Sequence, residues 1–477
     1  MRLRVQVVVE ADQGEVEVVR DAFELAPRPL APDTVGIGLA EAKELLAAVQ
    51  GAVVDEQVKA ALSEQERCAG CGRAHRHKDA RTIVLRTLFG TLRLPSPRWY
   101  RCGCGSQPTK TFSPLAALLP ERTTPELVYL EAKFAGLMSY GMSARLLAEV
   151  LPLGRALDPS AVRHHAQAVA QRLEDELGPE RVMFIEGCQD EWDRLPSPDL
   201  PLVVGLDGGF VHSAHQRSRR DGWFEVIAGK SVPADGNARC FGFVQTYDPK
   251  PKRRLYELLR AQGMAPNQHV VFITDGADDV RDLPLYLNPR SEHLLDWFHV
   301  TMRITVLGQL AKGLRAPPPH GDGDEEEGEE DFVDVDVARE LERLKWFLWH
   351  GNVFRALDAI EGLADDLFRW DPEPERAKLL KAVAEFDGYI RANASSIPSY
   401  AERYLAGELI SSAFVEATVN QVISRRMVKK QAMRWTPQGA HLLLQVRTRV
   451  LNGQLAADFR RWYPSFAQVA DGQEVAA

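Results

Sequence analysis

The hydrophobic pattern of the chain predicts buried strands in its middle part. Residues 202–206 are all apolar or glycine and lead directly to Asp207, and residues 270–273 form a second apolar run shortly before Asp275. Short continuous apolar runs of this kind are typical of strands that are buried on both faces. We therefore predict two strands that each end on an aspartate followed by glycine. An ordinary turn residue before a Gly-Gly hairpin is the alternative interpretation of Asp207.

The segments on either side of these strands have helical periodicity. Residues 40–62 predict one amphipathic helix, residues 124–178 predict three helices with short connections, and residues 337–455 are helical throughout. Three short helices fit a helix-turn-helix module, whose last helix would offer polar side chains to the major groove. The side chains that we predict to contact DNA from this helix are Arg163, His164 and Gln167. A helical spacer is the alternative.

Composition is that of a globular protein, but the charge is unevenly distributed. The chain has 477 residues, of which 45% are hydrophobic and 26% charged, enough for two to four domains. Much of the formal net charge of −9 comes from the acidic run at residues 321–336, which we expect to be part of a disordered linker. Basic residues gather elsewhere, and the cluster Arg425, Arg426, Lys429, Lys430 and Arg434 is predicted to bind a phosphate backbone.

No stretch of the sequence is apolar for long enough to predict a membrane span, and the N-terminus alternates like a strand instead of resembling a signal peptide. We therefore expect a cytoplasmic, nucleoid-associated protein with no membrane partner.

Four of the six cysteines lie close together in the sequence and predict a metal site. Cys68 and Cys71 form one pair, and Cys102 and Cys104 form the other, after a segment that reads as two strands. Two cysteine pairs at the base of a hairpin suit one tetrahedral Zn²⁺ with a structural role. Because Cys102 and Cys104 are separated by a single residue, His75 or His77 could replace one sulfur ligand.

The acidic residues have the pattern needed for phosphoryl transfer. Asp207 and Asp275 are predicted at strand ends, and Glu416 lies on a later helix. Three such carboxylates are the ligands that a pair of Mg²⁺ or Mn²⁺ ions needs in order to activate an attacking oxygen and stabilise a leaving one. Glu408 is the alternative to Glu416, and Asp278 and Asp279 are the alternatives to Asp275.

Four separated motifs resemble one known family. They are L-D-G-G-F-V around Asp207, I-T-D-G-A around Asp275, D-W-F-H at residues 296–299, and V-E-A-T-V-N around Glu416 followed by M-R-W-T-P-Q-G-A. In this order they resemble the DDE transposases of bacterial insertion sequences, with the Kra group, related to the Mutator-like transposases, as the nearest match. The resemblance implies that Asp207, Asp275 and Glu416 bind the catalytic metal ions and that Asp296 and His299 form the D-x-x-H element near the scissile phosphate.

The resemblance also implies a fold: an α/β protein with an RNase H-like mixed sheet and an all-helical insertion, preceded by a zinc-ribbon-like module and a helix-turn-helix module. The expected boundaries are 1–65 for an N-terminal region, 66–115 for the zinc-ribbon-like module, 120–178 for the helix-turn-helix module, 195–310 and 406–455 for the catalytic core, 311–336 for the acidic linker, 337–405 for the insertion and 456–477 for a tail.

The activity that the resemblance implies is metal-dependent cleavage at the ends of an insertion sequence, followed by joining of the 3′-hydroxyl ends to target DNA. The expected partners are double-stranded DNA and further copies of the same chain. A transposase-derived regulator that binds DNA without cutting it is the alternative function, and a metal-dependent phosphatase is a second alternative.

Overall fold

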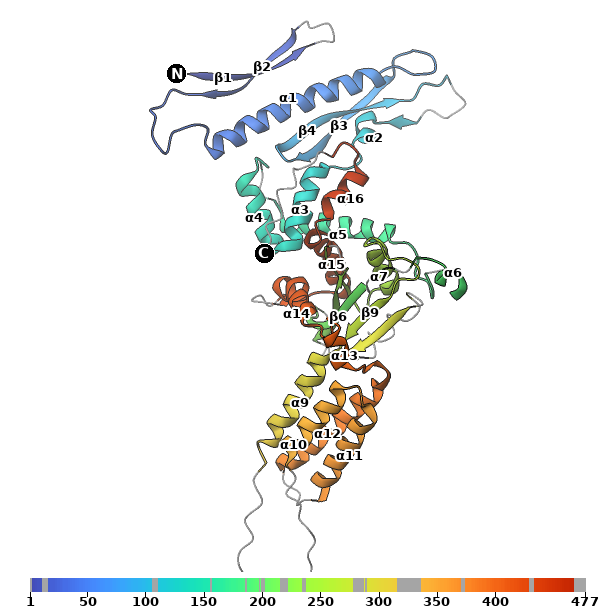
Figure 1. The fold of residues 1–477 in the computed structure, drawn as a ribbon. Helices are drawn as coiled ribbons and strands as arrows, with labels where there is room; N and C mark the ends of the chain where they lie inside the picture. The colour runs from blue at the N-terminus through green and yellow to red at the C-terminus, as the bar shows by residue number, and fades with distance from the viewer. Residues whose placement is uncertain are drawn as a thin grey trace, which may run out of the picture. The chain divides into compact units, whose positions relative to one another are not determined.

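The computed structural model describes residues 2–10, 16–104, 110–154, 157–184, 187–196, 198, 202–214, 222–233, 237–277, 287, 290–314, 336–369, 374–428 and 433–466. The protein is mixed α/β and divides into two compact units (Figure 1). Unit 1 comprises residues 1–172 and 449–477, and unit 2 comprises residues 173–448. Most of the acidic run expected as a linker lies outside the described residues, as do Asp278, Asp279, Lys429 and Lys430.

Unit 1 contains two antiparallel sheets and a set of helices. Its strands are β1 Leu3–Glu10, β2 Val16–Leu25, β3 Arg76–Thr87, β4 Gly90–Tyr100 and β5 Thr111–Phe112. Its helices are α1 Leu39–Gln65, α2 Pro114–Leu118, α3 Pro125–Leu137, α4 Tyr140–Val150, most of α5 Pro159–Glu176, and α16 Leu455–Trp462. Strands β1 and β2 form one sheet, and β3, β4 and β5 form the other.

The cores of unit 1 follow from the alternation of its strands and the apolar faces of its helices. Ile83 and Leu85 of β3 and Leu94 of β4 pack against Val54 of α1 and Leu115 of α2. The three predicted helices are present as α3, α4 and α5, but the expected C-terminal tail begins with helix α16. Phe459 of α16 packs edge-on against Tyr129 of α3 at a ring separation of 5.4 Å, so this part of the tail belongs to the core of unit 1.

Unit 2 is built on a five-stranded mixed sheet of order β10-β9-β6-β7-β8. The strands are β6 Leu202–His212, β7 Trp223–Val232, β8 Arg239–Val244, β9 Val270–Thr274 and β10 Ser291–Leu295. Strands β6, β7 and β8 pair in antiparallel fashion, whereas β9 pairs in parallel with both β6 and β10. Helix α7 (Pro251–Arg260) covers one face, where Leu255 and Leu259 pack on Val204, Leu206 and other apolar residues of the sheet.

The helices of unit 2 fall into two groups. One group consists of helices that pack side by side (Figure 1): α9 Trp297–Ala311, α10 Val337–Trp349, α11 Val353–Arg369 and α12 Pro374–Ala392. The other elements are α6 Gln189–Asp193, the 3₁₀ turn η1 Ala394–Ser396, α13 Tyr400–Leu405, α14 Ala413–Val419, the π-helix η2 Asn420–Val428 and α15 Pro437–Leu451. No helix within the described residues has both the length and the apolar character needed to cross a bilayer.

Glycines on β6 allow helix α14 to approach the sheet closely. A Cβ atom on Gly205 would lie 2.1 Å from Cγ2 of Val415 in α14, and one on Gly209 would lie 3.0 Å from Cδ1 of Ile423 in η2. Alternate residues of a strand share a face, so Asp207 lies on this same face between the two glycines. The glycines therefore place the helical elements that follow α13 directly over the candidate carboxylate.

We expect Gly205→Ala to destabilise unit 2 by about 1–3 kcal/mol, because the added methyl group has to displace Val415 from a packed interface. The matched control is Gly388→Ala on helix α12, where a new Cβ meets nothing within 4 Å. That control should stabilise the protein by about 0.5–1 kcal/mol, because alanine favours helix over glycine. Thermal unfolding of the two variants checks the prediction, and equal shifts in both would contradict it.

Candidate functional site

Three aspartates lie in one row at the carboxyl ends of the parallel strands. In the β6–β9 ladder Gly205 pairs with Ile273, and in the β9–β10 ladder Thr274 pairs with Leu295. Continuing the two registers beyond these pairs places Asp207 and Asp296 on either side of Asp275. Ligands of open α/β sheets bind at the carboxyl ends of the strands, so this row is the first candidate for a reactive site.

The prediction that β6 ends on Asp207 is wrong. The strand continues to His212, and the residues after Asp207 remain paired with β7, where Gly208 pairs with Ile227. Pairing with β9 stops at Gly205, because β9 ends at Thr274. Asp207 therefore lies at a strand end only with respect to β9. The uninterrupted pairing with β7 holds its backbone rigidly, which a loop would not do.

Asp296 is the most deeply buried of the three aspartates and has a supporting role. Its side chain caps helix α9, where Oδ1 accepts a hydrogen bond from the Phe298 backbone N–H (2.9 Å), and Oδ1 also accepts from the Ser412 backbone N–H (3.1 Å). Oδ2 accepts from the Ser412 hydroxyl and lies 2.9 Å from Nδ1 of His299. A carboxylate has about four acceptor positions. All of them are engaged in this structure, so Asp296 positions its neighbours and is a poor metal ligand.

His299 is oriented by Asp296 and lies beside the other two aspartates. A carboxylate can only accept, so Nδ1 of His299 carries the proton in this contact. The hydrogen bond from Asp296 raises the pKa of His299, and the negative charges of Asp296, Asp275 and Asp207 add to the effect against the opposing influence of burial. The predicted D-x-x-H pair is thus a physical contact that favours an imidazolium next to the carboxylate row.

Asp207 is less easily ionised than an exposed aspartate. Burial raises the pKa of its carboxyl group, His299 opposes this shift, and the nearby charges of Asp275 and Asp296 reinforce it. Like charges that crowd in a partly buried site disfavour ionisation unless a cation joins them. This crowding of oxygen ligands fits a divalent cation held by Asp207 and Asp275.

The loop that carries Asp275 is held in place by contacts with helix α12 and with Asn393. Its Oδ1 accepts from the Ala277 backbone N–H at 3.1 Å, and its backbone carbonyl accepts from the hydroxyl of Tyr389 on α12 at 2.9 Å. Gly276 has a φ of 81°, and a Cβ there would lie within 2.8 Å of both Leu295 and Asn393. Only glycine suits this backbone conformation and this close approach.

The structure does not bring Glu416 into a ready-made ligand cluster with the two aspartates. Glu416 is exposed on α14, and among the described residues Asp207, Asp275 and Glu416 do not form a group with ligand atoms within 4.8 Å of one another. Its neighbour Val415 is nevertheless packed over Gly205, two residues from Asp207 on the same face. Glu416 therefore belongs to the element that covers Asp207, although its carboxylate forms no ligand group with the two aspartates.

Glu408 is a weaker alternative than the sequence suggested. The prediction that residues 337–455 are helical throughout is wrong here, because α13 ends at Leu405, α14 begins only at Ala413 and Glu408 lies in the segment between them. Its carboxylate pairs with Arg403 at 2.8 Å. The helical geometry that would have turned Glu408 toward the same side as Glu416 is therefore missing.

The four clustered cysteines converge as predicted. The sulfur of Cys68 lies 3.6 Å from that of Cys104, the sulfur of Cys71 lies 3.3 Å from that of Cys102, and all four lie within 4.8 Å of one another. The backbone N–H groups of Gly70 and Cys71 lower the pKa of the Cys68 thiol to about 7, whereas the neighbouring cysteines raise the pKa of Cys104. Four sulfurs around one point fit tetrahedral Zn²⁺.

The histidines considered as substitute ligands are not part of this cluster. His75 instead packs edge-on against Phe112 at 5.0 Å and alongside Trp99 at 6.2 Å, and its Nδ1 lies 3.2 Å from the Tyr100 carbonyl. The spacing of Cys102 and Cys104 therefore does not require a histidine ligand.

We expect one zinc ion per chain to be released when the cysteines are modified. Cys71→Ser should lower zinc content to below half of the wild-type value and destabilise unit 1, because metal binding and folding of such modules are coupled. Cys188→Ser, an exposed cysteine outside the cluster, is the matched control. Elemental analysis and a colorimetric zinc-release titration measure the difference, and equal zinc content in both variants would contradict the assignment.

A second group of potential ligands is organised around an arginine. Glu174 of α5, Asp248 and His441 of α15 have ligand atoms within 4.8 Å of one another. The buried guanidinium of Arg254 donates to Asp248 at 2.9 Å and to both oxygens of Glu174 at 2.8 and 2.9 Å. Such bidentate pairing satisfies both charges. The group could also accept a metal ion by its composition, but in this structure the positive charge comes from Arg254.

The same network lowers the pKa of Glu174 to about 2, because hydrogen bonds from His441 and Arg254 outweigh the opposing effect of burial. A depressed carboxyl pKa contributes stability that is present above the unfolded-state value of about 4.5 and is lost as the pH falls toward 2. We expect the stability of unit 2 to fall steeply in this window and the slope to diminish in Glu174→Gln.

Replacing Arg254 with methionine should destabilise unit 2 by about 3–5 kcal/mol at pH 7, because the buried carboxylate of Asp248 and the partly buried carboxylate of Glu174 lose their partner. Arg260→Met at the exposed end of the same helix is the control and should change the stability by less than about 0.5 kcal/mol. Chemical denaturation at pH 7 and at pH 3 tests both statements. A loss for Arg254→Met that matches the control would show that the network is dispensable.

The predicted DNA-contacting residues differ in their exposure. Arg163 and His164 are exposed on α5, Gln167 is half-buried, and Arg425 and Arg434 are exposed. Arg426 is only 5% exposed and its guanidinium lies 5.3 Å from the ring centre of Trp435, so its position does not support a contact with DNA.

The sequence did not predict the side chains that hold the aspartates in place from distant segments of the chain. Ser412 and Tyr389 bind the backbone or carboxylate of the aspartates from segments far along the chain, and Arg254 joins three elements. No local sequence signal marks Ser412 or Tyr389 as partners of an aspartate. Comparisons with known proteins add no assignment: no protein-family model matches the chain, and no curated protein matches it.

Proposed function

We propose that this protein is a DDE-type transposase that cleaves DNA at the ends of an insertion sequence and joins the 3′-hydroxyl ends to target DNA. The observation that carries the proposal is the row of Asp207, Asp275 and Asp296 across the parallel strands, with His299 held beside it. The four motifs that resemble this family all belong to unit 2. The mixed sheet and the helical insertion support the RNase H-like fold that the resemblance implies.

The roles of the residues follow from their contacts. Asp207 and Asp275 would hold the divalent cation, and Glu416 on α14 would supply a further carboxylate ligand. Bound Mg²⁺ or Mn²⁺ would lower the pKa of an attacking water or 3′-hydroxyl and stabilise charge on the leaving oxygen. His299, whose raised pKa favours the charged form, attracts the scissile phosphate.

Asp296 acts through its neighbours. It fixes the ring of His299 by accepting from Nδ1, and it fixes the residue before α14 by accepting from Ser412. The carboxylate thus sets the relative position of the histidine and of the helix that carries Glu416. In this mechanism it is a positioning residue and need not touch the metal or DNA.

Unit 1 supplies features suited to DNA recognition. Its cysteine cluster fits a structural zinc module, and α5 exposes Arg163 and His164. Arg425 and Arg434 add exposed positive charge in unit 2. Double-stranded DNA and a second copy of the chain, needed to bring two element ends together, are the partners that this function requires.

The proposal is tested by a DNA cleavage assay in the presence of Mg²⁺ or Mn²⁺. The substrate is labelled DNA that carries the ends of the insertion sequence that encodes the protein. Asp207→Asn and Asp275→Asn should each lower cleavage by at least about 100-fold, since even residues that merely orient metal ligands contribute 10–100-fold. Glu416→Gln should do the same, whereas Glu408→Gln serves as the control and should retain activity, because its carboxylate already pairs with Arg403.

DNA binding by the same variants, measured separately from cleavage, distinguishes a loss of catalysis from a loss of DNA recognition. All four variants should still bind the labelled ends, because the mutated carboxylates do not contact the DNA backbone favourably. Binding of the ends without cleavage by the wild-type protein would favour a regulator that does not cut DNA. Cleavage that persists in Asp207→Asn would remove the aspartate row from the mechanism.

A further inference from the structure

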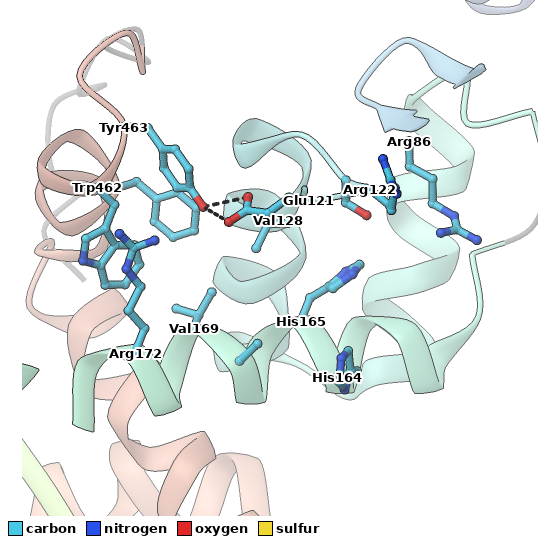
Figure 2. A pocket seen from close by; sticks show the side chains of 13 residues that line it. Arg86, Glu121, Arg122, Val128, His164, His165, Val169, Arg172, Trp462 and Tyr463 are labelled. Carbon is cyan, nitrogen blue, oxygen red and sulfur yellow. Dashed lines mark hydrogen bonds between the residues drawn. The ribbon is translucent and has the colours of Figure 1, made fainter. Parts of the chain in front are cut away.

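A pocket within unit 1 has the chemistry of a nucleotide site and plays no part in the reaction proposed above. It has a volume of about 320 Å³, at the lower end of the roughly 300–1,000 Å³ range of small-molecule sites. Its walls come from β3, the segment before α3, helix α5 and the end of α16 (Figure 2). Sequence positions as distant as Arg86 and Tyr463 therefore contribute to one concave surface.

One end of the pocket is lined by two aromatic rings and a guanidinium group, which together form an aromatic platform. The guanidinium carbon of Arg172 lies 4.4 Å from the ring centre of Trp462 and 5.5 Å from that of Tyr463. Figure 2 shows these three side chains together at one end of the pocket. Planar aromatic rings and arginine planes are the groups on which nucleobases stack, irrespective of base identity.

The opposite end of the pocket is cationic. Arg86 and Arg122 lie there (Figure 2), each attached to a backbone segment fixed by paired hydrogen bonds: Arg86 N–H to the Arg122 carbonyl and Thr124 N–H to the Arg86 carbonyl, both at 2.8 Å. The one acid of the lining, Glu121, already accepts from the Tyr463 hydroxyl at 2.9 and 3.0 Å. Guanidinium groups bind phosphate oxygens through paired donors.

His165 lies between the two ends with a fixed orientation. Its Nδ1 contacts the carboxylate of Glu131, which is buried in the helical core of unit 1. The carboxylate holds the ring, so Nε2 is the nitrogen left to a ligand. Along the pocket the aromatic platform comes first, then the imidazole, then the two arginines. This order matches that of the base, the sugar and the phosphate in a nucleotide.

We propose that this pocket binds a nucleoside 5′-phosphate group, with the base on the Arg172–Trp462 platform and the phosphate on Arg86 and Arg122. The group can come from two sources, a free nucleotide or an unpaired nucleotide of bound DNA. Helix α5, which contributes Arg172, also exposes Arg163 and His164, and His164 itself lines the pocket. The second source rests on the DNA binding proposed above.

Isothermal titration calorimetry with the full chain tests the proposal. The probes are thymidine 5′-monophosphate, thymidine, inorganic phosphate, a DNA duplex with one unpaired thymidine, and the same duplex fully paired. We expect the monophosphate, the duplex with the unpaired nucleotide, or both to bind at least tenfold more tightly than thymidine, phosphate or the paired duplex. Binding of the monophosphate identifies a site for free nucleotides, whereas a preference confined to the unpaired duplex identifies a site for displaced bases.

Variants locate the binding. We expect each of three variants, Arg122→Gln, Arg86→Gln and Trp462→Leu, to lower the preference for the monophosphate or the unpaired duplex at least fivefold. Arg81→Gln, an exposed arginine on the same strand as Arg86 but outside the pocket, should leave it within twofold. Zinc content and the thermal midpoint show whether each variant is folded, and Trp462→Phe, which keeps a ring, should restore part of the affinity. Equal affinity for all probes, or equal losses in Arg81→Gln and Arg86→Gln, would overturn the proposal.

Discussion

One buried carboxylate determines how the candidate active site is put together. Asp296 follows β10, caps α9, holds His299 and accepts two hydrogen bonds from Ser412, so a sheet edge and two helical segments meet at its oxygens. Placing a charge where the residue is 0% exposed is unfavourable unless every acceptor is used. Full hydrogen bonding keeps its pKa low in spite of burial, and the segments that supply the donors are thereby fixed relative to one another.

Local sequence patterns predicted much of this arrangement. Apolar runs located β6 and β9, and the placement of an aspartate just beyond each run put Asp207 and Asp275 into one row because the strands are parallel and adjacent. Cysteine spacing likewise identified a cluster whose sulfurs meet in space. These successes depend on residues close together in sequence, or on a strand end, where the backbone itself determines where a side chain lies.

Contacts between distant segments were not predictable in the same way. The pattern around Asp207 could not show that β6 continues to His212, because pairing with β7 is decided by a strand that begins at Trp223. The helical periodicity of residues 337–455 also gave no indication of the break before Ala413 or of the change to a π-helix at Asn420. Arg426 looked like part of a basic surface, yet packing beside Trp435 buries it. Each difference arises from tertiary packing, which a single sequence does not encode locally.

The hydrogen bond from Tyr389 to the carbonyl of Asp275 gives helix α12 a part in the geometry of the candidate site. Tyr389 belongs to α12, and Gly276 leaves no spare room against Asn393 just after that helix. A displacement of α12 by even an ångström would move the aspartate that it supports. The helices packed with α12 are therefore mechanically coupled to the aspartate row, because a change in their position is transmitted through Tyr389 to the backbone of Asp275.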